Sequence, residues 1–97
     1  MLEVIRGSER GCRYEVLGFP ITMGAAPGND LLIVESSISR SHAVLEGGRG
    51  YVEVVDQNSE NGTFVNGEPV RRHRLSHGDR LQLATEVEFR FRDRGRT

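Results

Sequence analysis

Short runs in which apolar and polar residues alternate recur along the whole chain, and they predict β-strands throughout. In residues 87–92, Val87, Phe89 and Phe91 alternate with charged side chains, so one face of this strand should be buried and the other wet. The runs predicted as strands are residues 2–6, 11–17, 20–23, 31–34, 43–46, 51–56, 63–65, 68–70, 73–75, 80–84 and 87–92.

Turn residues separate these runs at regular intervals. Asn66 and Gly67 lie between two runs and are typical of a type I′ hairpin turn, which needs two residues with positive φ. Residues 77–80 (HGDR) predict a second turn. No segment keeps a helical period over three turns. The pattern therefore predicts an all-β sandwich with no substantial helix.

Length and composition indicate one soluble domain, which we expect to occupy residues 1–93, with 94–97 as a tail. The chain has 97 residues, of which 36% are hydrophobic and 28% charged, with a net charge of -1. No apolar stretch approaches the roughly 18 residues of a membrane span, and the first residues do not show the basic-then-apolar pattern expected of a leader. We therefore expect a cytoplasmic protein without a membrane or nucleic-acid partner. All 13 basic residues are Arg, which suggests a GC-rich bacterial genome.

Cysteine and histidine usage argues against a metal site. Cys12 is the single cysteine, so no internal disulfide and no Cys-based zinc site can form, and we expect it to be a small buried residue. The three histidines have no metal-ligand spacing. We expect no metal and no other cofactor.

Two long polar segments interrupt the strands: SSISRSH at 36–42 and DQNSENGTF at 56–64. Their hydroxyl, guanidinium, amide and backbone N–H groups are the donors that a phosphate requires. Spread over two loops at one end of a sandwich, they would form a shallow phosphopeptide platform. The alternative is that these side chains only cap one another and the loop backbone.

The same residues also contain a possible nucleophile and base. Ser39 or Ser41 could pair with His42, and Asp56 could orient the imidazole. However, residues one and three apart on an extended segment seldom meet face to face, and no nucleophile-elbow motif is present. We therefore do not expect an enzyme.

Five segments in order make the chain resemble a forkhead-associated (FHA) domain over residues 2–92: ITMGAAPGNDLLI, SSISRSHAVL, DQNSENGTFVNGEPV, LSHGDRLQL and VEFRF. The resemblance implies an eleven-stranded antiparallel β-sandwich of the FHA/SMAD-like type, whose loops at one end read phosphothreonine peptides.

The resemblance also implies a role for individual residues. The implied phosphopeptide-binding residues are Ser39, Arg40, Asn61, Ser59 and Thr63. The implied structural supports of the loops are Gly24, Asn29, His42 and Gly62. Ser39 would donate its hydroxyl to the phosphate with Arg40 beside it, and Asn61 would hydrogen-bond the peptide backbone.

Two positions depart from the family pattern. Ala25 stands where the family usually has an Arg that reaches the phosphate, and a lost hydrogen bond to a charged group costs ~1.5–3 kcal/mol. Glu60 would add about 1 kcal/mol of repulsion per unit charge. Arg40 alone could sustain a weak contact with the phosphate, or an arginine later in the chain could supply the missing donor. The candidates for the second are Arg71, Arg72 and Arg74.

The sequence thus predicts a protein-interaction module that recognises phosphothreonine peptides, weakened by Ala25 and Glu60. The alternative is a degenerate FHA domain that binds a protein partner independently of phosphorylation, as an assembly module of a larger protein. A third possibility is a purely structural domain.

Overall fold

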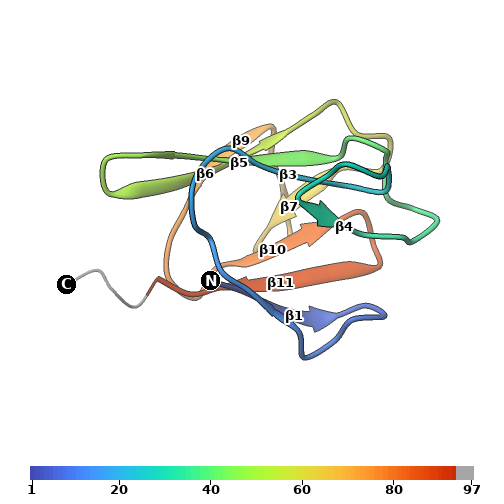
Figure 1. Ribbon diagram of the computed structural model, residues 1–97, viewed down its shortest axis with the longest axis horizontal. Coiled ribbons are helices and arrows are strands. Elements are labelled where there is room, and N and C mark those ends of the chain that lie inside the picture. Colours follow the sequence, from blue (N-terminus) through green and yellow to red (C-terminus); the bar gives the residue numbers. More distant parts are fainter. Residues whose placement is uncertain (94–97) are drawn as a thin grey trace.

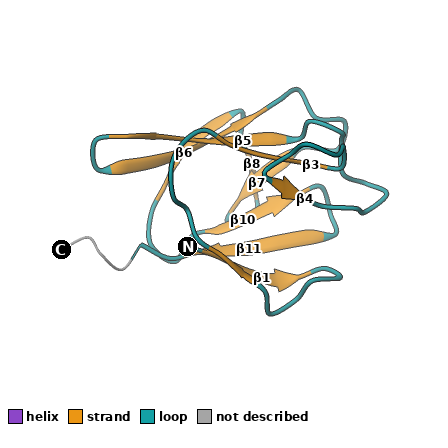
Figure 2. Ribbon diagram, in the orientation of Figure 1, coloured by secondary structure: helices purple, strands orange, loops and turns teal. Residues whose placement is uncertain are grey.

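Two β-sheets face each other in the computed structural model, which describes residues 1–93 and contains no helix among them (Figures 1 and 2). The predicted tail, 94–97, lies outside the described residues. The strands are β1 (Leu2–Arg6), β2 (Arg13–Tyr14), β3 (Ile21–Gly24), β4 (Leu31–Leu32), β5 (Ala43–Gly48), β6 (Tyr51–Asp56), β7 (Thr63–Val65), β8 (Glu68–Pro69), β9 (Arg72–Leu75), β10 (Arg80–Leu83) and β11 (Val87–Phe91).

The strand order places β2 and β4, two of the three shortest strands, at the same edge of the sandwich. One sheet has the order β2-β1-β11-β10-β7-β8 and the other β4-β3-β5-β6-β9. The pairing is antiparallel except for β3 with β4, which run parallel, so the expectation of an entirely antiparallel sandwich is wrong at this one pair. The fold is otherwise the predicted all-β sandwich of eleven strands.

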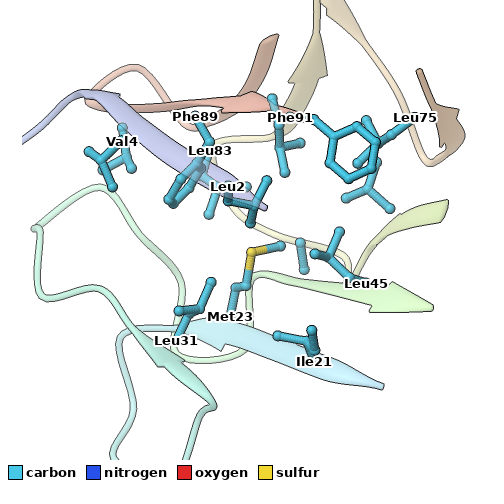
Figure 3. Close-up of a cluster of buried hydrophobic side chains, with 14 of the residues drawn as sticks. Leu2, Val4, Ile21, Met23, Leu31, Leu45, Leu75, Leu83, Phe89 and Phe91 are labelled. Atoms are coloured by element: carbon cyan, nitrogen blue, oxygen red, sulfur yellow. The ribbon is translucent and has the colours of Figure 1, made fainter. Parts of the chain in front are cut away.

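Apolar side chains from both sheets meet in the space between them (Figure 3). In β11 the predicted alternation is confirmed, since Phe89 and Phe91 are each 2% exposed. Met23 of β3 and Leu45 of β5 are fully buried from the opposite sheet. Each such side chain contributes roughly 1.5–3 kcal/mol by its burial, so the core holds the sheets together. Cys12 does not join it: the thiol is free and the residue exposed, contrary to the sequence-based expectation.

The predicted turns are present. Asn66 and Gly67 have φ values of 52° and 87°, as a type I′ turn requires. The Asn66 amide donates to the Asp79 carboxylate at 3.0 Å, and its oxygen accepts the Arg80 N–H at 3.0 Å. The side chain of Asn66 therefore connects the β7–β8 turn to the second predicted turn, at residues 77–80.

The β3–β4, β4–β5, β6–β7 and β10–β11 connections lie at one end of the sandwich, on the right in Figure 1. The β5–β6 turn lies at the opposite end. Both polar loops predicted to present side chains, 36–42 and 56–64, are at the first end. Within residues 1–93, no helix exists that is long and apolar enough to cross a bilayer.

Candidate functional site

The β3–β4 and β4–β5 loops are in backbone contact because Gly24 has no side chain. A Cβ on Gly24 would lie 2.1 Å from the Arg40 carbonyl oxygen and 2.8 Å from its carbon. The close approach lets the Ala25 N–H donate to the Ser39 carbonyl at 3.0 Å, and the Asn29 amide donate to the Arg40 carbonyl at 2.9 Å. Gly24 and Asn29 therefore set the position of the segment that carries Ser39 and Arg40.

His42 is fully buried and connects the two polar loops. Its Nδ1 accepts the Ser39 N–H at 3.1 Å, which leaves the ring proton on Nε2 to donate to the Gly62 carbonyl at 2.8 Å. Both ring nitrogens are engaged by backbone groups. Neither ring nitrogen of His42 is hydrogen-bonded to a serine hydroxyl, as that of a general base would be. The serine–histidine pair considered from the sequence therefore does not form.

Ser39 and Arg40 present donors at the surface of this platform. The Ser39 Oγ accepts the Glu60 N–H at 3.0 Å, so the hydroxyl is positioned while its proton remains available to another acceptor. Arg40 is exposed, and its guanidinium makes no hydrogen bond or ion pair within residues 1–93. Because the two residues are consecutive, they place a hydroxyl donor and a guanidinium in the same short segment, and a bound anion requires such donors.

Asn61 is exposed in the β6–β7 loop, and the β4–β5 loop fixes the position of its side chain. Its amide N–H donates to the Ser37 carbonyl at 2.9 Å. The Ser37 hydroxyl in turn donates to the Glu86 carboxylate of the β10–β11 turn at 2.5 Å. The Asn61 side-chain oxygen has no hydrogen bond in the described part of the chain, so it can still accept from a ligand.

Asp56 organises the inside of the β6–β7 loop. It accepts the Ser59 hydroxyl at 2.5 Å, the Ser59 N–H at 3.1 Å and the Thr63 hydroxyl at 2.6 Å. Burial would by itself raise the pKa of Asp56, but these hydrogen bonds outweigh it and the pKa is lowered. The ionised carboxylate thus holds the loop closed.

Ser59 and Thr63, two of the predicted binding residues, therefore direct their hydroxyls toward Asp56 in this structure. Thr63 is only 1% exposed. The Ser59 Oγ also accepts the Gly62 N–H at 3.1 Å. The bracing role of Asp56 was missed from the sequence, although an Asp three residues before a Ser in a turn is a recognisable signal for such capping.

The later arginines differ in what they contact. Arg72 pairs with Glu53 at 2.5 Å and approaches Glu46 at 3.7 Å. The Arg74 guanidinium lies 4.1 Å above the centroid of the Tyr51 ring. Arg71 alone of the three has an unpaired guanidinium in the described chain, and its carbonyl accepts the Asp56 N–H at 2.8 Å.

No three His, Cys, Asp or Glu side chains of the described residues converge as metal ligands. What converges is a set of neutral and cationic donors on loops of a rigid sandwich. That arrangement defines a module that binds a peptide or an anion at its surface.

Comparison with known proteins identifies the family. Residues 21–84 match the FHA domain family, and the chain belongs to it. FHA domains bind phosphothreonine peptides and are interaction modules rather than enzymes.

The chain is similar to two bacterial regulators. It is 40% identical over 83 residues to the "oxoglutarate dehydrogenase inhibitor" of Corynebacterium diphtheriae, a match that covers 86% of this chain and 58% of that protein. It is 39% identical over 84 residues to the "glycogen accumulation regulator GarA" of Mycolicibacterium smegmatis, covering 86% and 52%. The chain thus spans little more than half the length of these curated relatives.

The fold is that of solved FHA structures. Mycobacterium tuberculosis EmbR, solved with a low-affinity phosphopeptide, superimposes with a TM-score of 0.85 at 27% identity, covering 94% of this chain and 23% of the EmbR chain.

Proposed function

We propose that this chain binds phosphothreonine peptides through Ser39, Arg40 and Asn61. The observation that carries the proposal is the Ser39 hydroxyl beside the unpaired Arg40 guanidinium. The Ser39 Oγ accepts the Glu60 N–H, so the hydroxyl proton of Ser39 can be donated to a ligand. A phosphate needs such donors, and Arg can contact it with two. Asn61, fixed through Ser37, would hydrogen-bond the peptide backbone and order it.

The remaining predicted residues would support the loops rather than touch the peptide. Each of them makes or permits a contact within or between loops. In this proposal they are Gly24, Asn29, His42, Ser59, Gly62 and Thr63.

The affinity should be low for the fold because of Ala25 and Glu60. Ala25 is half-buried, packs against the core and already uses its N–H, so position 25 offers no side-chain donor. The loss of one charged hydrogen bond lowers affinity roughly ten- to a hundredfold. The Glu60 side chain is exposed in the same loop as Asn61 and adds like charge near a phosphate of about -1.5 to -2.

A second candidate function is phosphorylation-independent binding of a protein partner, which the missing donor at Ala25 favours. The Corynebacterium relative is named as an inhibitor of an enzyme, so a partner of this kind for the present chain would be a cytoplasmic enzyme. For both candidates we expect the chain in the cytoplasm of a bacterium, and for the first candidate it would act downstream of Ser/Thr kinase signalling.

A titration with phosphothreonine peptides and their unphosphorylated counterparts tests the proposal. Ala25→Arg should tighten only the phosphorylated peptides, by roughly tenfold or more. Ala25→Met is the matched control, because it adds comparable length without donors or charge. Glu60→Lys should act in the same direction as Ala25→Arg, and Ser39→Ala should weaken binding.

If wild type and Ala25→Arg bind both forms of each peptide equally, recognition does not depend on phosphate and the second candidate is the better account. If neither protein binds any peptide, phosphothreonine reading is excluded for this chain.

A further inference from the structure

The exposed apolar side chains of the described residues are concentrated at one place in the fold. The large ones are Leu17, which is 78% exposed, Phe19 at 40%, Leu32 at 47% and Val34 at 76%. Scattered exposed apolar residues are normal on a protein surface, but a contiguous group is typical of an interaction site.

This place is the edge of the sandwich where β2 and β4 lie. Each of these edge strands has only two residues, so neither covers the gap between the sheets. The connection from β2 to β3, residues 15–20, crosses from one sheet to the other there (Figure 1). Beside it the surface is hollowed.

Two adjoining hollows lie along this edge. The first, of about 160 Å³, is lined on one side by Leu32 and Val34. The second, of about 420 Å³, is lined by Leu17 and Phe19. Tyr14 and Leu31 line both, so the two hollows adjoin. We call this surface the edge groove and define it by Tyr14, Leu17, Phe19, Leu31, Leu32 and Val34.

The charges that line the edge groove are all negative. Glu9 and Glu35 line the first hollow, and Glu15 and Asp30 line the second, whereas no basic residue lines either. Glu35 accepts the Ser8 N–H at 3.1 Å, and hydrogen bonds from Ser8 lower the pKa of Glu35. The Glu35 carboxylate is therefore ionised at neutral pH.

We propose that the edge groove docks a segment of a partner protein whose apolar side chains are flanked by Lys or Arg. The apolar residues would enter the two hollows, and the basic residues would face the carboxylates on their rims. The charge argues against a second copy as the occupant, because a twofold contact through this surface would oppose the same four carboxylates to each other.

The edge groove and the proposed phosphopeptide site share the β4–β5 loop. Val34 and Glu35 belong to the β4–β5 loop, which continues directly to Ser39. Five residues of extended chain reach about 17 Å at most, so one partner could occupy both places. The docking itself does not depend on phosphate, and its test needs none.

The test uses three synthetic peptides as probes, followed by ¹⁵N NMR of the whole chain. The first peptide, KLKVKLK, is apolar and basic; the second, ELEVELE, reverses the charge; the third, KSKTKSK, keeps the charge without apolar side chains. We expect KLKVKLK alone to shift the amide signals of residues 15–19 and 31–35.

Surface variants then connect the shifts to the edge groove. Leu17→Asn and Val34→Asn replace side chains that are mostly exposed, and each should weaken KLKVKLK binding roughly tenfold. Glu15→Gln should also weaken it, whereas Glu68→Gln, on the exposed β8 at the other edge, should leave it unchanged.

Four results would overturn the proposal. These are shifts by ELEVELE or KSKTKSK equal to those by KLKVKLK, shifts that map outside the edge groove, no shifts with any peptide at millimolar concentration, and shifts of the groove signals with protein concentration alone. The last would assign the groove to a second copy.

Discussion

Replacing His42 should damage both the stability of the domain and the proposed binding site. His42 is 0% exposed and bonds Ser39 N–H and the Gly62 carbonyl, at 3.1 and 2.8 Å. His42→Ala leaves both backbone groups without a partner, at about 1 kcal/mol or more each, and opens a cavity. We expect the free energy of unfolding to fall by roughly 2–4 kcal/mol, a large part of the stability of a small domain.

Two conservative variants separate the contributions of the ring nitrogens. In His42→Asn the amide oxygen can take the place of Nδ1 and keep the bond to Ser39, whereas in His42→Gln the amide nitrogen can take that of Nε2 and keep the bond to Gly62. Each should lose less stability than His42→Ala, about 1–2 kcal/mol.

Urea denaturation followed by far-UV circular dichroism measures the losses, and amide hydrogen exchange reports whether the Ser39 N–H is still protected. The Ser39 amide should stay protected in His42→Asn and exchange faster in His42→Gln. If His42→Ala loses less than about 0.5 kcal/mol, or if both amide variants leave Ser39 equally protected, the bridging role assigned to His42 is wrong.

Gly24→Ala and Gly47→Ala form a matched pair of variants. In Gly24→Ala the added Cβ would lie 2.1 Å from the Arg40 carbonyl oxygen, which is fixed backbone. In Gly47→Ala it would lie 2.2 Å from the Phe19 ring, which is 40% exposed and can move. In urea denaturation we expect a loss of about 2–3 kcal/mol for Gly24→Ala and under about 1 kcal/mol for Gly47→Ala, and equal losses would contradict the distinction between fixed backbone and movable side chain. Because the pKa of Asp56 lies below its ordinary 3.8, the stability it provides is present above about pH 4 and is lost as the pH falls through the lower folded value. Asp56→Asn should flatten the fall in stability below pH 4, and an unchanged slope would count against this role.

Much of the fold was predictable from the sequence because alternation depends on burial of one sheet face. Strands β10 and β11 lie between neighbours in their sheet, and their apolar residues are all buried, as the alternation predicts. The Asn66-Gly67 turn was predictable for a different reason, since few residue pairs accept two positive φ values.

The edge strands were harder to predict because an apolar run does not reveal how much of it is covered. Residues 11–17 and 31–34 were both predicted as strands, but only two residues of each form a strand. Val34 is 76% exposed. The partner that would bury such residues is outside the chain, so nothing in the alternation distinguishes them from core residues.

The sequence predicts which residues form the candidate site, but it does not predict the directions of their side chains. Serine and threonine hydroxyls have the same donor chemistry whether they face a phosphate or a carboxylate. Ser59 and Thr63 donate to Asp56, while the Ser39 hydroxyl is held at its oxygen by the Glu60 N–H. Which acceptor each hydroxyl meets depends on the loop conformation, and that conformation depends on tertiary contacts such as those of His42.

The two proposed sites together offer a physical reason for a phosphate site that lacks a donor at Ala25. Val34 of the edge groove lies within about 17 Å of Ser39, so for a partner that binds both places the second contact becomes intramolecular. At the millimolar effective concentration that a short connection provides, even a weak phosphate contact is occupied. Selectivity would then require both a phosphothreonine and an apolar, basic segment in one partner. A peptide that carries both features should therefore bind more tightly than either feature alone, and Val34→Asn should remove that gain while leaving the phosphate contact at Ser39 intact.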